Sequence, residues 1–366
     1  MNRRHAAFLL LPILFVSIMT AKARTSNRAK NSSTAVTSAE VETISPLTPL
    51  TSAQSKWVES SLRHMSVEEK VGQLLFTTYH GSFTAADSET YAQMMHDIND
   101  LHVGGFITIT HGSPLGIVKD QAYPTAVLAN QLQSKSKLLL LIGADYERGT
   151  AMRQDAGTSF PTAMAVAAAG DPKDAYTMGK ITALEARAVG VQWIYAPVCD
   201  VNNNPANPII NTRSFGEDPA RVSQYVSEFI HGVEENGGLA TAKHFPGHGD
   251  TATDSHIDLP TIKADRERLE HLELVPFRAA IAAGVGSIMT GHLNVPAFEP
   301  DPNTPATLST NILTDLLRKQ LGFQGLVITD ALDMGGVTVR YAPAEAAVRA
   351  IVAPTGAFVW NLFCPA

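Results

Sequence analysis

Short apolar runs alternate with longer amphipathic segments over most of the chain. The amphipathic segments carry apolar residues at helical spacing, and three of them stop at a glycine, as helices often do. Strands that are apolar on both faces and alternate with helices indicate a parallel sheet. The apolar runs cover residues 74–78, 104–110, 138–147, 191–201, 239–245, 287–293 and 326–332. The expected helices cover residues 174–190, 219–237, 266–284 and 341–351.

Seven or eight strand–helix units predict a single catalytic domain of the α/β class, a (β/α)₈ TIM-type barrel. The main alternative is a doubly wound open sheet, which would need a glycine-rich phosphate loop after an early strand, and the sequence has none. The eighth unit is incomplete, because AFVWNLF (357–363) can form a strand but no helix follows it. We therefore expect a chain truncated around the eighth unit, and poorly soluble or weakly active as written.

The N-terminus has the pattern of an export signal. Arg3 and Arg4 precede an apolar run over residues 8–19, and residues 21–23 are Ala-Lys-Ala, a small-x-small cleavage pattern. The run is shorter than the ~20 residues that span a bilayer, which favours cleavage over anchoring. We expect an exported, periplasmic or extracellular protein. Its expected parts are a signal peptide (1–23), a Ser/Thr-rich flexible linker (24–55) and the catalytic domain (56–366).

The composition of the chain excludes some classes of function. The chain has 366 residues, of which 45% are hydrophobic and 17% charged, so it can bury a large core. Its net charge is −7, and cleavage of the signal would make that charge more negative, because the segment contains Arg3, Arg4 and Lys22 but no acidic residue. Such an acidic chain argues against nucleic acid as a partner and against membrane binding beyond export. The two cysteines, Cys199 and Cys364, form no disulfide framework.

Reactive side chains follow most of the apolar runs. In a barrel of parallel strands, groups at the carboxyl ends of the strands face the active site. A single polar group at the end of a strand is common, but reactive groups after five of the runs favour a shared pocket. These groups are Asp145, Glu147 and Arg153; Asp200 and residues 202–204; Lys243 and His244; His292; and Asp330.

Two residues have the kinds of side chain that glycoside hydrolysis needs. Asp330 directly follows a buried run, where a rigid element can hold a nucleophile. His256 lies in the stretch KHFPGHGDTATDSHIDLP (243–260), and Asp254 is close enough in sequence to fix its tautomer. A carboxylate nucleophile and a separate proton donor are the minimum for a retaining glycosidase.

The motifs KHFPGHGDTATDSH and VITDALDM together resemble the β-N-acetylhexosaminidase branch of glycoside hydrolase family 3, from about Ser55 to Ile351. The resemblance implies removal of terminal β-linked N-acetylhexosamine from small cell-wall or chitin-type oligosaccharides, with no cofactor and no metal. It implies that Asp330 forms the covalent glycosyl-enzyme and that His256, paired with Asp254, is the general acid/base. The residues implied to hold the sugar are Asp145, Arg153, Arg213, Lys243 and His244.

One position departs from that branch. Its usual pattern is D-x-E-G-G-x-x-x-R, whereas this chain reads Asp145-Tyr146-Glu147-Arg148-Gly149 and reaches Arg153 at the same spacing. Arg148 therefore stands where the resemblance expects glycine.

Other functions stay open at this point. Another family 3 β-glycosidase, or a phosphorylase, would use much of the same site. A non-catalytic sugar-binding barrel or inactive fragment is a further alternative, because the eighth unit is incomplete. A metal-dependent hydrolase would leave Asp330 and Arg213 without a role; its ligands would be His244, His248, Asp250 and His256. The sequence leaves the oligomeric state open.

Overall fold

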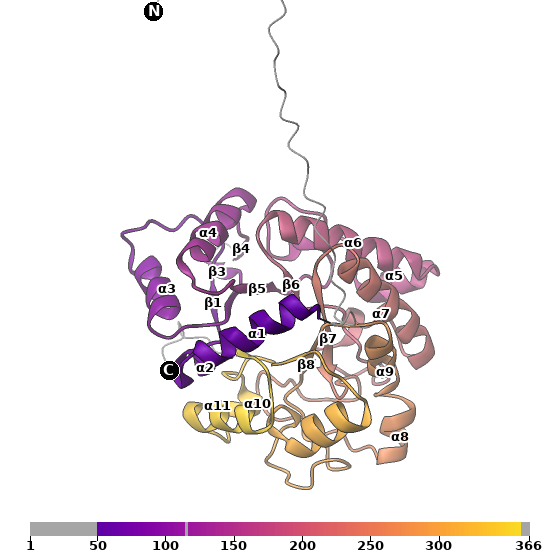
Figure 1. Ribbon diagram of the computed structural model, residues 1–366. Coiled ribbons are helices and arrows are strands. Elements are labelled where there is room, and N and C mark those ends of the chain that lie inside the picture. The colour runs from indigo at the N-terminus through magenta and orange to yellow at the C-terminus, as the bar shows by residue number, and fades with distance from the viewer. Residues whose placement is uncertain (1–49, 114–115, 360–366) are drawn as a thin grey trace, which may run out of the picture. The chain divides into compact units, whose positions relative to one another are not determined.

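The computed structural model describes residues 50–113 and 116–359. Its main sheet has eight parallel strands in the order β10-β1-β2-β5-β6-β7-β8-β9, and Figure 1 shows helices arranged around them. Every apolar run of the sequence overlaps one of these strands, so the predicted (β/α)₈ barrel is confirmed. The strands are β1 Leu75–Tyr79, β2 Gly105–Thr108, β5 Leu141–Ala144, β6 Trp193–Ile194, β7 Leu239–Phe245, β8 Ser287–Thr290, β9 Leu326–Thr329 and β10 Phe358–Val359.

The last strand joins the two ends of this sheet. β10 pairs in parallel with β1, with Val359 opposite Phe76. On its other side, a bridge connects Ala357 to Ile328 of β9. These pairings close the barrel with the first part of the AFVWNLF segment. Residues 360–366, which include the remainder of that segment, lie outside the described residues.

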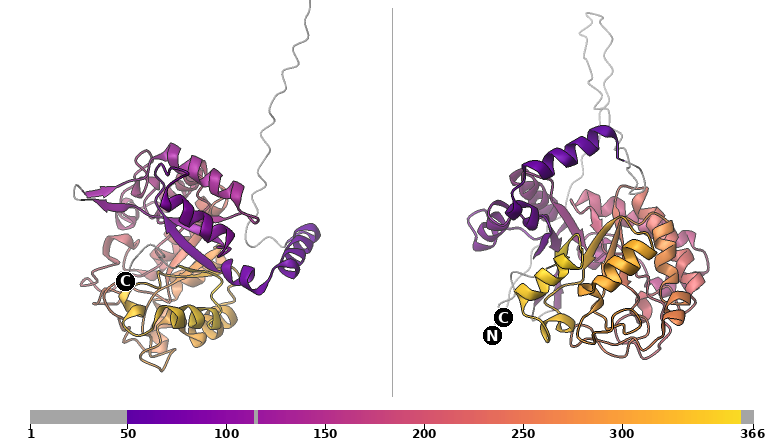
Figure 2. Two further views of the ribbon diagram at one scale, coloured as in Figure 1. Left: turned by 90° about the vertical axis from the view of Figure 1, so that its left-hand side faces the viewer. Right: turned by 60° about the horizontal axis from the view of Figure 1, so that its bottom comes forward.

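The first described helix, α1 Ser52–His64, begins inside the segment that the sequence assigns to a linker (24–55). The Thr51 hydroxyl accepts the N–H of Gln54 at 3.2 Å, and Gln54 Oε1 accepts the N–H of Thr51 at 2.8 Å. This capping box starts the helix within a stretch whose composition suggested flexibility. In both views of Figure 2, α1 stands away from the strands, and none of its residues is buried. The expected signal peptide and the rest of that linker lie outside the described residues.

The single helix expected over residues 266–284 is wrong. The segment forms α8 Arg266–His271 and α9 Val275–Ala282, with the buried Glu273 between them. Pro276 cannot donate the backbone bond that a continuous helix needs, but it is tolerated in the first turn of α9. The other three expected helices are confirmed; they are α6 Lys173–Ala188, α7 Pro219–Glu234 and α11 Pro343–Val352.

No helix in the described part of the chain is both long and apolar enough to cross a bilayer. The remaining helices are α2 Val67–Gly72, α3 Glu89–Asn99, α4 Ala122–Lys135, η1 Thr150–Met152, α5 Ala163–Ala169, α6 Lys173–Ala188, η2 Asn211–Arg213, α7 Pro219–Glu234, η3 Ala306–Leu308, η4 Asn311–Gln320, α10 Gly335–Thr338 and α11 Pro343–Val352. The short strands β3 His111–Ser113 and β4 Gly116–Val118 form a separate antiparallel pair.

Aromatic side chains fill the inside of the barrel. Strands β1 and β6 are separated in the sheet by β2 and β5, yet the rings of Phe76 and Trp193 lie 5.2 Å apart. Tyr195 continues this cluster at 5.4 Å from Trp193, and the indole N–H of Trp193 donates to Thr241 Oγ1 at 2.9 Å. Contacts across the interior make it a packed core, so a ligand can enter only at the ends of the strands.

Candidate active site

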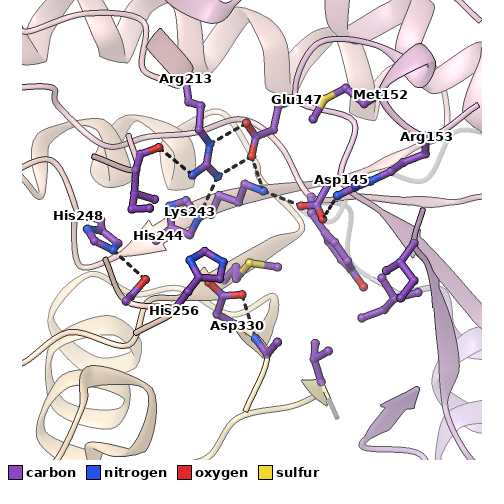
Figure 3. Close-up of a pocket in the computed structure, with 18 of the residues that line it drawn as sticks. Asp145, Glu147, Met152, Arg153, Arg213, Lys243, His244, His248, His256 and Asp330 are labelled. Carbon is purple, nitrogen blue, oxygen red and sulfur yellow. Dashed lines mark hydrogen bonds and ion pairs between the residues drawn. The ribbon is translucent and has the colours of Figure 1, made fainter. Parts of the chain in front are cut away.

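A cavity of about 460 Å³ lies at the carboxyl ends of the strands. Its wall brings together side chains that follow β5, β7 and β9, and Figure 3 shows them converging. Of the eight residues to which the resemblance gives a catalytic or sugar-binding role, only Asp254 is absent from the wall, and it hydrogen-bonds His256, which is part of it. The others in the wall are Asp145, Arg153, Arg213, Lys243, His244 and Asp330.

A network of ion pairs forms one side of this pocket. The side chain of Lys243 is only 2% exposed, and its Nζ lies 2.8 Å from Asp145 Oδ1 and 2.7 Å from Glu147 Oε1. Arg153 contacts the other oxygen of Asp145 at 2.9 Å. Arg213 holds both oxygens of Glu147, at 2.7 and 3.0 Å. Two carboxylates and three cations are therefore held in one fixed arrangement (Figure 3).

These partners keep the network ionised. Burial alone would raise the pKa of Asp145, but Lys243 and Arg153 lower that pKa to about 2. Burial likewise opposes ionisation of Glu147, whose pKa Lys243 and Arg213 hold far below its usual range. Burial would lower the pKa of Lys243, and the two carboxylates raise it instead. The pocket therefore presents fixed charges at neutral pH, which suit the recognition of polar hydroxyl and amide groups.

Asp200 orients the histidine that follows Lys243. This fully buried carboxylate lies 2.7 Å from Nδ1 of His244 and accepts the backbone N–H of His248 at 2.6 Å. Arg213 can only donate, so its 3.4 Å contact with His244 Nε2 makes that nitrogen an acceptor. Burial opposes ionisation of Asp200, but His244 lowers its pKa. The imidazole of His244 is thereby fixed in tautomer and direction.

Asp330 lies at the end of β9, where its backbone N–H donates to Thr290 O at 3.0 Å. Its Oδ1 accepts the N–H of Ala331 at 2.8 Å. Burial would raise the pKa of Asp330, but the neighbouring His292 and His244, with that backbone N–H, lower it. His292 Nε2 donates in turn to the carbonyl oxygen of Ala331 at 2.8 Å. Asp330 is thus an ionised carboxylate on a rigid strand end.

His256 reaches the same pocket from the loop after β7. Its Nδ1 lies 2.7 Å from Asp254 Oδ1, and its side chain is 62% exposed. The backbone N–H of Gly335, the first residue of α10, donates to His256 O at 3.1 Å. Any side chain at Gly335 would collide with the backbone of Ile257, so this close approach requires glycine. Figure 3 shows the His256 ring beside Asp330.

The four residues of the metal alternative have separate partners. Asp250 pairs with Arg268 at 2.7 Å, and the two ring nitrogens of His248 contact Thr251 and Ser255 at 2.7 and 3.1 Å. Within residues 50–113 and 116–359, no group of three or more His, Cys, Asp or Glu could hold a metal ion. In that part of the chain, His244, His248, Asp250 and His256 therefore do not form the shared ligand set that a metal-dependent hydrolase would need.

Glu147 belongs to the site; the sequence placed it among the polar groups at the strand ends but gave it no catalytic or sugar-binding role. It pairs with both Lys243 and Arg213. Its position offered a usable signal, because it follows Asp145 by two residues, and side chains two apart on an extended chain point to the same side.

Comparison with known proteins gives a consistent set of relatives. Residues 66–360 match the family model described as glycosyl hydrolase family 3 N terminal domain. A beta-hexosaminidase A from Pseudoalteromonas piscicida is 40% identical over 233 residues, which are 59% of this chain and 39% of that protein. A beta-N-acetylglucosaminidase/beta-glucosidase from Cellulomonas fimi is 34% identical over 314 residues, 83% of this chain and 53% of that protein.

A solved structure shares this architecture. The family 3 beta-N-acetylglucosaminidase from Paenibacillus sp. str. FPU-7 is 40% identical, with a TM-score of 0.74. The match covers 81% of this chain and 55% of that one. The chain therefore spans about half the length of these relatives, or less.

Proposed function

The chain belongs to glycoside hydrolase family 3, and from that membership we propose that it removes terminal β-linked N-acetylhexosamine from cell-wall or chitin-type oligosaccharides. The observation that carries the proposal is the meeting of Asp330 and His256 in one pocket beside a network of buried ion pairs. A nucleophile, a separate proton donor and a polar clamp for one sugar are what this reaction needs. The names of the relatives support N-acetylhexosamine as the sugar.

In the proposed first step, a carboxylate oxygen of Asp330 attacks the anomeric carbon of the terminal sugar. The bond between that carbon and the leaving oxygen breaks as a glycosyl–aspartate bond forms. The lowered pKa of Asp330 keeps the nucleophile ionised. The N–H of Ala331 holds one oxygen in place, so the carboxylate needs little reorientation before attack.

His256 is the proposed proton carrier. Asp254 occupies its Nδ1, which leaves Nε2 to donate a proton to the departing oxygen. In the second step Nε2 takes a proton from water, the water oxygen bonds to the anomeric carbon, and Asp330 is released as a carboxylate. Two displacements at one carbon retain the β configuration.

The ion-pair network is the proposed sugar clamp. Asp145, Lys243, Arg153 and Arg213 offer charged donors and acceptors at fixed positions, and His244 adds an oriented imidazole. Charge-assisted hydrogen bonds of this kind suit hydroxyl groups and an N-acetyl carbonyl. Glu147 supports the clamp by holding Arg213 and Lys243.

We also propose that the chain is exported. The apolar run after Arg3 and Arg4 and the Ala-Lys-Ala pattern at residues 21–23 support a cleavable signal peptide. Sequencing the N-terminus of the secreted protein tests it.

The test of the activity compares a chromogenic β-N-acetylglucosaminide with the matching β-glucoside. We expect kcat/KM to be higher for the N-acetylglucosaminide and the first product to be the β anomer, detected by NMR. Faster turnover of the glucoside would favour a β-glucosidase, an activity that the name of the Cellulomonas fimi relative includes. A folded protein that turns over neither substrate would favour the non-catalytic alternative.

A further inference from the structure

Arg148 differs from the other cations of the pocket wall. Arg153, Arg213 and Lys243 each pair with Asp145, Glu147 or both. Arg148 has an exposed side chain, and in the described part of the chain its guanidinium has no ion pair. The charged groups of the wall are four cations, Arg148, Arg153, Arg213 and Lys243, and three carboxylates, Asp145, Glu147 and Asp330. These seven groups thus give the pocket one more positive than negative charge, in a chain whose net charge is −7.

The backbone around Arg148 is held in place. Its carbonyl accepts the N–H of Phe160 at 3.0 Å, and its N–H contacts Met152 Sδ at 3.3 Å. Glu185 of α6 anchors the same loop by accepting the N–H and the hydroxyl of Thr158, at 2.9 and 2.6 Å. The stem of Arg148 therefore starts from a defined position at the edge of the pocket.

The position of Arg148 indicates which part of a substrate it meets. The buried ion pairs occupy the inner wall, where the proposed function places the terminal sugar. Arg148 lines the same cavity but is exposed and takes no part in these ion pairs, so its guanidinium is available to a group other than the terminal sugar. A guanidinium binds carboxylate or phosphate through paired N–H donors.

We propose that Arg148 forms an anion-binding subsite for the group beyond the scissile bond. This inference rests on the proposed function. The anion is a carboxylate on the leaving sugar or an inorganic phosphate that replaces water as acceptor, since both occupy the same space. In the phosphate case, an oxygen of hydrogen phosphate bonds to the anomeric carbon as the bond to Asp330 breaks, which gives a sugar 1-phosphate and a free carboxylate.

Binding measurements test the subsite without requiring turnover. The ligands are inorganic phosphate and a matched pair of phenyl thio-β-N-acetylglucosaminides, one with a carboxylate on the ring, titrated by calorimetry. We expect Arg148→Ala to weaken binding of phosphate or of the carboxylate ligand roughly threefold to tenfold, and the neutral ligand less. Arg148→Lys should keep part of the effect, because it keeps the charge but loses the paired donors.

Arg278→Ala is the matched control, because it removes an exposed arginine of α9 that does not line the pocket. It should bind all three ligands like the wild type. The subsite is refuted if the wild type neither binds phosphate nor prefers the carboxylate ligand, or if Arg148→Ala changes neither result.

Turnover separates this inference from the proposed function. If the wild type hydrolyses a neutral 4-nitrophenyl β-N-acetylglucosaminide but Arg148→Ala leaves anion binding intact, only the subsite is refuted. If nothing is hydrolysed while phosphate binding depends on Arg148, the subsite stands and the proposed function fails. With active enzyme, a sugar 1-phosphate formed in phosphate buffer identifies the acceptor as the source of the anion. Free sugar alone, with a preference for the carboxylate aglycone, identifies the leaving group.

Discussion

The Nδ1 atom of His256 lies 2.7 Å from Oδ1 of Asp254, and the same oxygen accepts the backbone N–H of His256 at 2.8 Å. One carboxylate oxygen thus fixes both the peptide and the ring of a largely exposed histidine. Because Nδ1 is occupied, Nε2 is the nitrogen that can exchange a proton with a bound sugar.

His256→Ala should harm the natural substrate more than an activated one. A sugar leaving group needs a proton and a nitrophenolate does not, so we expect roughly 10² to 10⁴-fold loss of kcat on a disaccharide and a much smaller loss on the aryl glycoside. Asp254→Asn should act in the same direction but less strongly. His96→Ala is a matched control, since His96 of α3 makes a similar 2.7 Å contact with Asp100, the residue that caps that helix, and neither residue lines the pocket. Equal losses on both substrates would exclude a proton-transfer role.

Asp330→Asn should abolish nucleophilic catalysis and leave the fold intact. We expect several orders of magnitude loss of kcat on both substrates, with an unchanged melting temperature. A 2-fluoro sugar that traps the intermediate should label Asp330, as found by peptide mass spectrometry. Asp333 is the control carboxylate, because it lies three residues further along the chain and does not line the pocket. A label on Asp333 would overturn the assignment.

Glu185→Gln should loosen the loop that carries Glu147 and Arg153. Glu185 accepts the hydroxyl of Thr150 at 2.5 Å besides both donors of Thr158, and an amide cannot accept all three. We expect KM to rise about threefold to tenfold, with a smaller change in kcat, because the loop positions the clamp and not the nucleophile.

Glu228→Gln is the control for Glu185→Gln, since Glu228 lies on α7, outside the pocket wall, and pairs with the exposed Lys173 of α6. It should leave KM unchanged. A loss confined to kcat in Glu185→Gln would contradict the positioning role.

Glu234 should make stability depend on pH. Burial raises its pKa from the usual 4.5 to about 7, although the N–H groups of Ala240 and Gly286 oppose the rise. Between these values the folded chain keeps a proton that the unfolded chain releases. Stability therefore falls as pH rises from about 4.5 to about 7 and is constant above.

Glu234→Gln should remove this dependence, because the amide oxygen still accepts both N–H groups. We expect its melting temperature to match the wild type at pH 5 and to exceed it by ~2 to 6 °C at pH 8. Glu235→Gln, which changes the exposed neighbour, should behave like the wild type at both values. A variant with the same pH profile as the wild type would show that Glu234 is ionised in the fold.

The sequence predicted the barrel well because strand burial is a local property. Runs such as residues 326–332 are apolar on both faces, and only a sheet covered by helices uses such strands. The ends of these runs also located Asp145, Lys243 and Asp330, since parallel strands bring their carboxyl ends to one side. The division of residues 266–284 at Glu273 was not foreseen, because the apolar spacing continues across the break and only Pro276 marks it.

Side-chain partners were harder to foresee. Lys243 meets Asp145 from nearly a hundred residues away, and its simultaneous contact with Glu147 depends on how β5 and β7 are placed around the barrel. A local sequence pattern holds no information on contacts between residues that lie so far apart in the chain. The sequence could predict Asp254 as the partner of the His256 ring, because the two residues belong to the same short loop.

The ammonium of Lys243 shared by Asp145 and Glu147 has a consequence for how such a protein can evolve. Replacing any one of the three removes a partner that offsets the burial of the others, although Arg153 and Arg213 still pair with the two carboxylates. A single change in this group is therefore costly, and a lineage is expected to keep the three residues together. Arg148 shares no partner with them and can be exchanged in a single step. Inheritance should therefore preserve the inner wall of the pocket and allow variation at its rim.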